Sequence, residues 1–300
     1  MNVRTTPLLA ALLVALVTGC SRDAAKLAPP APQAATPVAA AAPPAPAQVK
    51  QDSYADLMRA VFGTHYRPAS ADALADLRDP DNPTKPVRMV ATGVGSTLLP
   101  TGETVLAVNA DMAEADGTAV AGHSSPGLLS IYVLNQQEGQ WRVLRRHESV
   151  AALGSSGQIG TVKWVQLAKG KTGLAVLNGA TYQGATITYL ALFDPTAEKI
   201  TDLMAEDPAV YSGNGDDCGP MPTCWDAKAA WRFEPGAAVY DDLVLTITGH
   251  EDVAKDHDGE MVDGDKPIAR IRKPLDGKAR YVFDGKQYRL SEGENTIPGI

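Results

Sequence analysis

The sequence has few cysteines and no surplus of basic residues, and an abundance of either would have indicated a specific function. It contains only three cysteines in 300 residues. Its 27 lysines and arginines are outnumbered by 35 acidic residues, which gives a net charge of −8. Nucleic-acid binding depends on clustered lysine and arginine, so we expect no nucleic-acid partner. With 44% hydrophobic and 21% charged residues, the composition is that of a globular protein, not of a disordered or fibrous one.

Complete catalytic motifs are also missing. Gly170-Lys171-Thr172 resembles the end of a phosphate-binding loop, but Val165 stands where the first glycine is required. Ala151 stands where a zinc-protease helix would place its second histidine after His147. The run Gly154-Ser155-Ser156-Gly157 is one residue short of a nucleophile elbow. The sequence therefore favours a protein that is not an enzyme.

The first twenty residues have the pattern of an export signal. Arg4 is the one charged residue before an apolar run over residues 7–17, and Thr18-Gly19-Cys20 follows directly. The run is shorter than the roughly 20 residues that a membrane-spanning helix needs. A basic start, a short apolar run and small residues together predict a signal peptide over residues 1–19.

The end of this segment, Val17-Thr18-Gly19-Cys20, resembles the lipobox of bacterial lipoproteins, although leucine is commoner than valine at its first position. The resemblance implies that Cys20 is lipidated, with acyl chains such as palmitate, and becomes the first residue of the mature protein. Ser21, in place of aspartate, implies sorting to an outer membrane, facing the periplasm or the surface, if the organism has one. Two or more acyl chains anchor a protein stably to a membrane. The alternative is an ordinary secretory peptide with an incidental cysteine.

Residues 20–50 are expected to form a tether behind the lipidated cysteine. Residues 21–50 contain seven prolines, twelve alanines and no aromatic residue, so they cannot bury enough apolar surface to fold. A proline-rich chain is extended at about 3.1 Å per residue, so these thirty residues reach roughly 90 Å at most.

Residues 51–300 predict a single, mainly β domain that begins with a helical segment over residues 52–80. Apolar residues recur at helical spacing between Tyr54 and Phe62, and Gly63 is a stop signal. Leu74 and Leu77 suggest a second helix that starts after Ser70. Because the first helix carries few basic residues, we expect this segment to pack on the body and not on a membrane.

From residue 87 to residue 290, short apolar runs alternate with turn residues, which is typical of strands. The runs can be grouped into three four-stranded antiparallel meanders, because Leu106, Leu174 and Leu243 recur at intervals of 174 − 106 = 68 and 243 − 174 = 69 residues. Such meanders resemble propeller blades or the FG-GAP and VCBS repeats of secreted bacterial proteins. Three units are too few for a closed propeller, so the resemblance implies an open stack or sandwich. Chance spacing is the alternative. The predicted strands are 87–90, 104–108, 128–134 and 141–144; then 162–167, 174–177, 186–193 and 199–203; then 231–233, 243–248, 280–283 and 286–290.

Three predicted loops, 110–127, 178–185 and 249–278, leave the same edge of their units, and we take this edge as the candidate binding face. His123 and His250 belong to it and are candidate binding residues. Long loops are often functional, although they can equally be tolerated insertions.

Cys218 and Cys224 remain once Cys20 is lipidated, and in an oxidising compartment two such cysteines predict a disulfide. Trp225 follows the ring directly and is a third candidate binding residue, for a protein or glycan partner, although such a tryptophan is more often part of a core.

Seven acidic residues lie between residues 251 and 265, and Asp256 and Asp258 are candidate ligands for Ca²⁺. The calcium-loop template fails at its first ligand, which is Ala254, so a solvated acidic loop is the alternative. Taken together, the sequence predicts a lipid-anchored envelope protein with a non-catalytic binding body. An envelope hydrolase acting on a glycan or peptide polymer, using His123 or the Asp256 and Asp258 region, is the competing hypothesis. A spacer without a ligand is the third.

Overall fold

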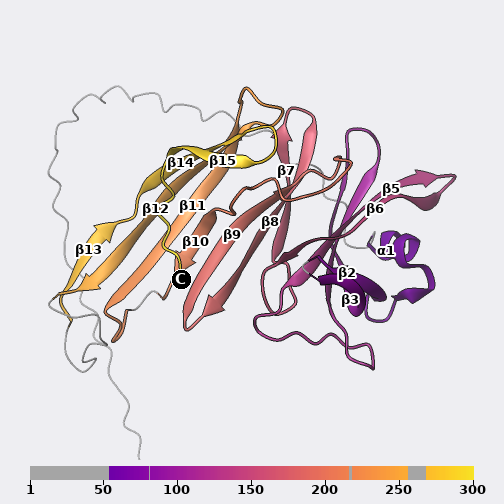
Figure 1. Ribbon diagram of the computed structural model, residues 1–300, viewed down its shortest axis with the longest axis horizontal. Coiled ribbons are helices and arrows are strands. Elements are labelled where there is room, and N and C mark those ends of the chain that lie inside the picture. The colour runs from indigo at the N-terminus through magenta and orange to yellow at the C-terminus, as the bar shows by residue number, and fades with distance from the viewer. Residues whose placement is uncertain (1–53, 81, 216–217, 256–267) are drawn as a thin grey trace, which may run out of the picture. The chain divides into compact units, whose positions relative to one another are not determined.

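The computed structural model describes residues 54–80, 82–215, 218–255 and 268–300 (Figure 1). These residues form a mainly β body, as the sequence predicts, with one α-helix. The predicted signal peptide, the lipidation site Cys20, the tether and the calcium ligands Asp256 and Asp258 lie outside the described residues. Within the described part of the chain, no helix is long and apolar enough to cross a bilayer.

Helix α1 spans Tyr54–Phe62, within the segment that apolar spacing predicts. Its apolar stripe, formed by Leu57, Met58 and Val61, is buried. The helix ends at Gly63, whose φ of +57° favours glycine, and a short 3-10 turn, η2, follows over Gly63–His65.

The first sheet has six antiparallel strands in sequential order. Tyr132 and Leu106 from this sheet share a buried cluster with Leu57 and Met58, so α1 covers one of its faces. The strands are β1 (Tyr66–Arg67), β2 (Asp72–Asp79), β3 (Asn82–Leu98), β4 (Thr104–Met112), β5 (Gly127–Gln137) and β6 (Gln140–Leu153).

The second sheet has nine antiparallel strands, and Figure 1 shows them from β7 to the yellow C-terminal strands. The order along the sheet is β7, β8, β9, β10, β11, β12, β14 and β15, and β13 pairs with β12. The strands are β7 (Thr161–Ala168), β8 (Lys171–Tyr182), β9 (Ala185–Phe193), β10 (Ala209–Gly213), β11 (Thr223–Glu234), β12 (Asp242–Ala254), β13 (Arg270–Pro274), β14 (Gly277–Phe283) and β15 (Tyr288–Gly293).

The two sheets share a hydrophobic core. Leu129 and Ile131 of β5 lie in one buried cluster with Leu174 of β8 and Phe193 of β9. Alternate residues of β8 and β9, such as Leu192, instead join a separate cluster with β11, β12, β14 and β15. Because successive side chains of a strand point to opposite faces, β8 and β9 contribute to both cores.

Four predictions about the elements were wrong. Residues 72–79 form strand β2 and not a second helix, because pairing with β3 satisfies their backbone amide and carbonyl groups and buries Ala73 and Leu77. Residues 199–203 are not a strand. The predicted loop 178–185 is the end of a hairpin, since only Gln183 and Gly184 separate β8 from β9. In the predicted loop 249–278, residues 249–254 belong to β12 and residues 270–274 form β13, because these two segments pair with each other.

The three-meander repeat is not confirmed. The strands of the first predicted unit, β3 to β6, are neighbours in the first sheet. The strands of the second and third predicted units belong to one continuous nine-stranded sheet, in which β10 and β13 are additional members. Blades of a propeller would each form a sheet of their own.

Candidate functional site

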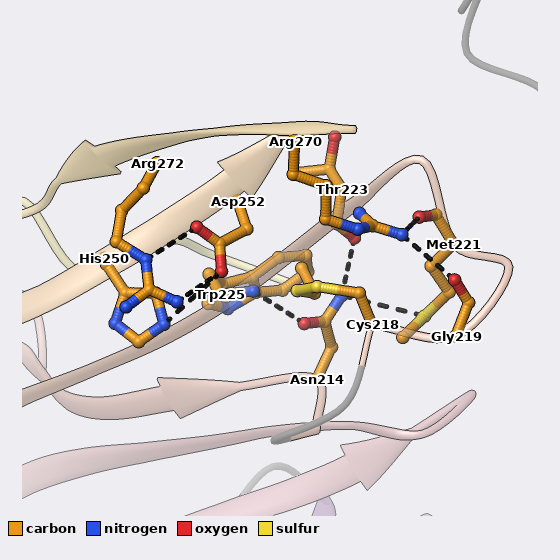
Figure 2. Close-up of a disulfide and its surroundings, with 11 residues drawn as sticks. Asn214, Cys218, Gly219, Met221, Thr223, Trp225, His250, Asp252, Arg270 and Arg272 are labelled. Atoms are coloured by element: carbon orange, nitrogen blue, oxygen red, sulfur yellow. Dashed lines mark hydrogen bonds and ion pairs between the residues drawn. A yellow bond between two sulfur atoms is a disulfide. The ribbon is translucent and has the colours of Figure 1, made fainter. Parts of the chain in front are cut away.

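The predicted disulfide between Cys218 and Cys224 is present and closes a small ring between β10 and β11 (Figure 2). The two Cα atoms are 5.3 Å apart, which is a usual spacing for a disulfide. Within the ring, the amide of Met221 donates to the carbonyl of Cys218 at 3.0 Å. Gly219 has a φ of +47°, which favours glycine at this turn.

The ring is also fixed from outside by strands β12 and β13. The Arg270 guanidinium donates to the carbonyls of Gly219 and Met221, at 3.0 and 2.8 Å (Figure 2). The amide of Ala254 donates to the carbonyl of Pro222 at 2.8 Å. The ring is therefore held in place by hydrogen bonds as well as by the disulfide.

Trp225 is held by two partners in β10 and the loop after it. Its backbone amide donates to Oδ1 of Asn214 at 2.8 Å, and its indole Nε1 donates to Oγ of Ser212 at 2.8 Å. Ser212 is fully buried, whereas Trp225 is half-buried. The indole nitrogen is already used within the fold, so these contacts favour a structural role for Trp225.

His250 and Asp252 come from β12 and lie beside Arg272 of β13. Arg272 donates from Nε and Nη2 to the two carboxylate oxygens of Asp252, at 2.8 and 2.7 Å, and His250 Nε2 lies 3.8 Å from Asp252 Oδ2 (Figure 2). The Arg272 guanidinium holds the pKa of Asp252 below its usual range, and Asp252 raises the pKa of Arg272 in return. Asp252 is thus committed to an ion pair.

The same carboxylate lies within 4.8 Å of both disulfide sulfurs, a grouping that could hold a metal ion if the cysteines were reduced. Metals bind cysteine as the thiolate, and sulfurs joined in a disulfide carry no such charge. Arg272 also already binds both carboxylate oxygens of Asp252. The observed arrangement does not support a metal centre here.

His123 lies on the loop between β4 and β5 and attaches that loop to β8. Its Nε2 is 2.7 Å from the carbonyl oxygen of Thr181, and its own carbonyl accepts from the amide of Ser156 at 3.1 Å. Ser155 donates from Oγ to the carbonyl of Gly179 at 3.0 Å. The histidine and both serines thus bind backbone groups, an arrangement that holds a loop and does not activate a nucleophile.

The structure places His123 against Thr181 of β8 and His250 within β12 of the same sheet. Thr181, Thr186, Gly213, Asp226 and His250 are successive partners on strands β8 to β12. Strands are spaced about 4.8 Å apart, so His250 is separated by about 19 Å from Thr181, the residue that His123 contacts.

A cavity of about 540 Å³ lies elsewhere in the body, and sequence reasoning missed it. One wall is formed by residues 205–209, and the other by β14, β15 and the C-terminal residues 294–297. Tyr281 and Ile297 give it apolar surface, whereas Glu206, Glu294 and Arg289 give it charges of both signs. We call it the strap cavity, because its first wall comes mainly from the segment 200–208, which we call the strap.

The strap is the segment 200–208 between β9 and β10, which lies against both β9 and β15. The amide of Leu203 donates to the carbonyl of Leu192 at 2.7 Å, and the amide of Tyr288 donates to the carbonyl of Leu203 at 2.7 Å. Leu203 and Met204 are buried in the cluster formed by β11, β12, β14 and β15. The backbone of the strap therefore forms hydrogen bonds to both flanking strands, although the strap itself is not a regular strand.

Two carboxyl groups meet in the strap. Burial, and then the neighbouring Asp207, raise the pKa of Asp202 to about 8. Burial also raises the pKa of Asp207, and hydrogen bonding to Asp202 and Asn178 offsets part of this rise. In its sequence, a segment with Asp202, Glu206 and Asp207 resembles an ordinary solvated loop. No sequence signal therefore identified the pair Asp202 and Asp207.

The chain was compared with known protein families, with curated proteins and with solved structures, and no family model, curated protein or solved structure matches it.

Proposed function

We propose that this protein is a lipid-anchored cell-envelope protein whose body is a non-catalytic binding module for a protein or glycan partner. The observation that carries the envelope assignment is the Cys218–Cys224 disulfide. Disulfides persist in oxidising compartments, which a chain reaches by export. The disulfide also uses both cysteines of the body and leaves Cys20 as the one free for lipidation.

The strap cavity supports the binding role. Its volume of about 540 Å³ falls within the range of ligand sites, which are usually concave and lined by apolar groups with a few polar ones. Among the described residues, the candidate groups for catalysis are engaged in other contacts: His123 binds a backbone carbonyl, and Asp252 binds Arg272. These contacts favour binding over hydrolysis. Calcium binding at Asp256 and Asp258 stays a prediction, and titration calorimetry with Ca²⁺ tests it.

The anchor is tested by replacing Cys20 with serine in the full-length chain. We expect the wild type to incorporate an alkyne-tagged palmitate and to fractionate with membranes, and Cys20→Ser to do neither. Cys224→Ser is the matched control, because it also removes one cysteine but should leave the label unchanged. Equal labelling of the wild type and Cys20→Ser would contradict the proposal.

The binding role is tested by obstructing the cavity. Leu290 lines it and is 48% exposed, so Leu290→Arg should leave the fold intact. Leu98 is a similarly exposed leucine on β3, 56% exposed and not part of this cavity, so Leu98→Arg is the matched control. We expect partners crosslinked in intact cells to be lost with Leu290→Arg and kept with Leu98→Arg. Turnover of peptidoglycan or another envelope polymer by the purified protein would instead favour the hydrolase.

A further inference from the structure

The strap cavity has one wall that is attached by individual hydrogen bonds, including those from the Gln287 and Asn295 side chains to the carbonyls of Met204 and Ala209, and not by a regular strand ladder. Residues 205–209 belong to the strap and to the start of β10, and they face β14, β15 and the C-terminal residues across the cavity. Besides the backbone bonds of Leu203, the strap is held where the amide of Leu190 donates to the carbonyl of Pro208 at 3.0 Å. The amide of Ala205 donates to the carbonyl of Tyr288 at 3.1 Å. The position of this wall therefore depends on how firmly the strap is attached to β9 and β15.

Asp202 supplies part of that attachment with its side chain. Its Oδ1 accepts from the amide of Leu192 on β9, at 3.3 Å, and from the amide of Met204 in the strap, at 2.9 Å. A carboxyl oxygen thus does what the backbone carbonyl of a neighbouring strand would do in a regular ladder. Losing this contact would free two amides and detach the strap from β9 at its first residues.

Asp207 is the charged group that faces Asp202. The two carboxyl groups are hydrogen-bonded to each other, which requires a proton between them. From β8, Asn178 contributes an amide directed at Asp207, and from β9 the contact is the Leu192 backbone. Among the described residues, no lysine, arginine or histidine forms an ion pair with either aspartate. The shared proton is therefore what relieves the repulsion between the two carboxyl groups.

We propose that Asp202 and Asp207 form a proton-dependent latch that holds the strap on β9 and so keeps one wall of the strap cavity in place. With one proton shared, residues 202–208 stay attached and the wall is formed. When that proton is lost, the two charges repel, the strap leaves β9 and the cavity loses this wall. The inference rests on the proposed binding role of the cavity, because it assigns a regulation to that site.

The attached state of the strap binds the proton more tightly than the released state does. This difference sets the direction of the pH effect. Burial and the Asp207 charge raise the pKa of Asp202 to about 8, whereas a released, solvated aspartate has its ordinary pKa near 3.8. The attached state is therefore favoured at low pH, and it loses this advantage progressively as the pH rises toward 8. Between these two pKa values, each pH unit multiplies the released population by about ten.

Hydrogen–deuterium exchange of the mature chain measures this release without any ligand. After correction for the intrinsic exchange rate, we expect protection of the Leu192, Leu203 and Ala205 amides to fall at least tenfold between pH 6 and pH 8. Asp202→Asn keeps an acceptor oxygen and leaves Asp207 as the one ionisable group of the pair, so the repulsion cannot arise and its protection should fall less with pH than that of the wild type. Glu294→Gln, on the cavity rim outside the pair, is the control and should behave like the wild type.

Asp207→Asn gives a second, milder test, because it removes the repelling charge but not the burial of Asp202, so we expect a smaller fall in protection at pH 8. Trypsin cleavage after Lys199, which is exposed next to the strap, offers an independent measure. Relative to the rate of trypsin on a peptide substrate at the same pH, we expect it to accelerate more in the wild type than in Asp207→Asn. Equal protection of the wild type at both pH values, or the same fall in Asp202→Asn, would overturn the latch. If protection changes with pH while Leu290→Arg keeps every partner, the latch stands and the binding role of the cavity fails.

Discussion

The ring closed by Cys218 and Cys224 allows a quantitative prediction about stability. A disulfide stabilises a fold mainly by reducing the entropy of the unfolded chain, and the effect grows with the logarithm of the loop length. The two cysteines are six positions apart, so the loop is short and its closure is worth about 2 kcal/mol. We therefore expect the double variant Cys218→Ala, Cys224→Ala to lose about 2 kcal/mol in its free energy of unfolding.

The folded ring should survive this change because Arg270 and Ala254 hold its carbonyls independently of the sulfurs. For a body of about 250 residues, 2 kcal/mol corresponds to a fall of roughly 4 °C in the melting temperature. Urea denaturation of the soluble Cys20→Ser chain measures the free energy, and calorimetry measures the melting temperature. Wild-type protein treated with dithiothreitol should match the double variant, since both lack the same crosslink.

Two results would refute this reasoning. A loss below about 0.5 kcal/mol would mean that the crosslink adds nothing to a loop already ordered in the unfolded chain. A loss above about 5 kcal/mol exceeds what crosslinking entropy provides and would mean that the ring supports the packing of β12 and β13. Adding Arg270→Ala separates these cases, because additive losses indicate that the disulfide and the arginine act independently.

Three further predictions concern single residues. Gly157 and Gly170 have similar φ angles of +72° and +75°, but a Cβ at Gly157 would lie 2.2 Å from the Asp111 carboxylate, whereas one at Gly170 meets nothing within 4 Å. In urea denaturation we expect Gly170→Ala to cost about 1 kcal/mol and Gly157→Ala at least about 2 kcal/mol more; equal losses would show that the contact is irrelevant. Leu174 is fully buried between the two sheets, so Leu174→Ala should cost about 3 kcal/mol in the same assay, and a loss below about 1 kcal/mol would contradict this packing. The amides of Gln287 and Lys286 and the Arg289 side chain lower the pKa of Asp284 to about 2, so the stabilisation it provides is present above pH 4 and is lost as the pH falls toward 2. The wild type should accordingly be more stable than Asp284→Asn at pH 6, with a difference that shrinks between pH 5 and pH 3; a difference constant with pH would exclude the ionised carboxylate as its source.

Strands were predictable from the sequence where apolar residues alternate with polar ones or form a continuous run. The runs around Leu106, Leu174 and Leu243 are strands, and they are short apolar runs bounded by turn residues, as is typical of buried strands. The pair Leu74 and Leu77 predicted a helix, since a spacing of three is ambiguous in a short run. Pairing with β3 decided in favour of a strand, and this partner lies outside the local sequence.

Within the candidate site, only the disulfide was predictable from the sequence. Two cysteines and a predicted export signal are enough to predict the disulfide, because pairing depends on compartment and number. The roles of His123 and Trp225 depend on Thr181 and Ser212, which come from other strands. The spacing of residues along the chain carries no information about such neighbours.

The sequence by itself determined that this protein is mainly β and that Cys218 pairs with Cys224. These features follow from the alternation of side chains along strands and from the number of cysteines. The tertiary structure alone decided that the second and third groups of strands merge into one sheet, that His250 lies in a strand, and that the strap lines a cavity. It also placed Asp202 against Asp207, because a pKa near 8 arises from burial and from a neighbouring charge, and both depend on how distant segments pack.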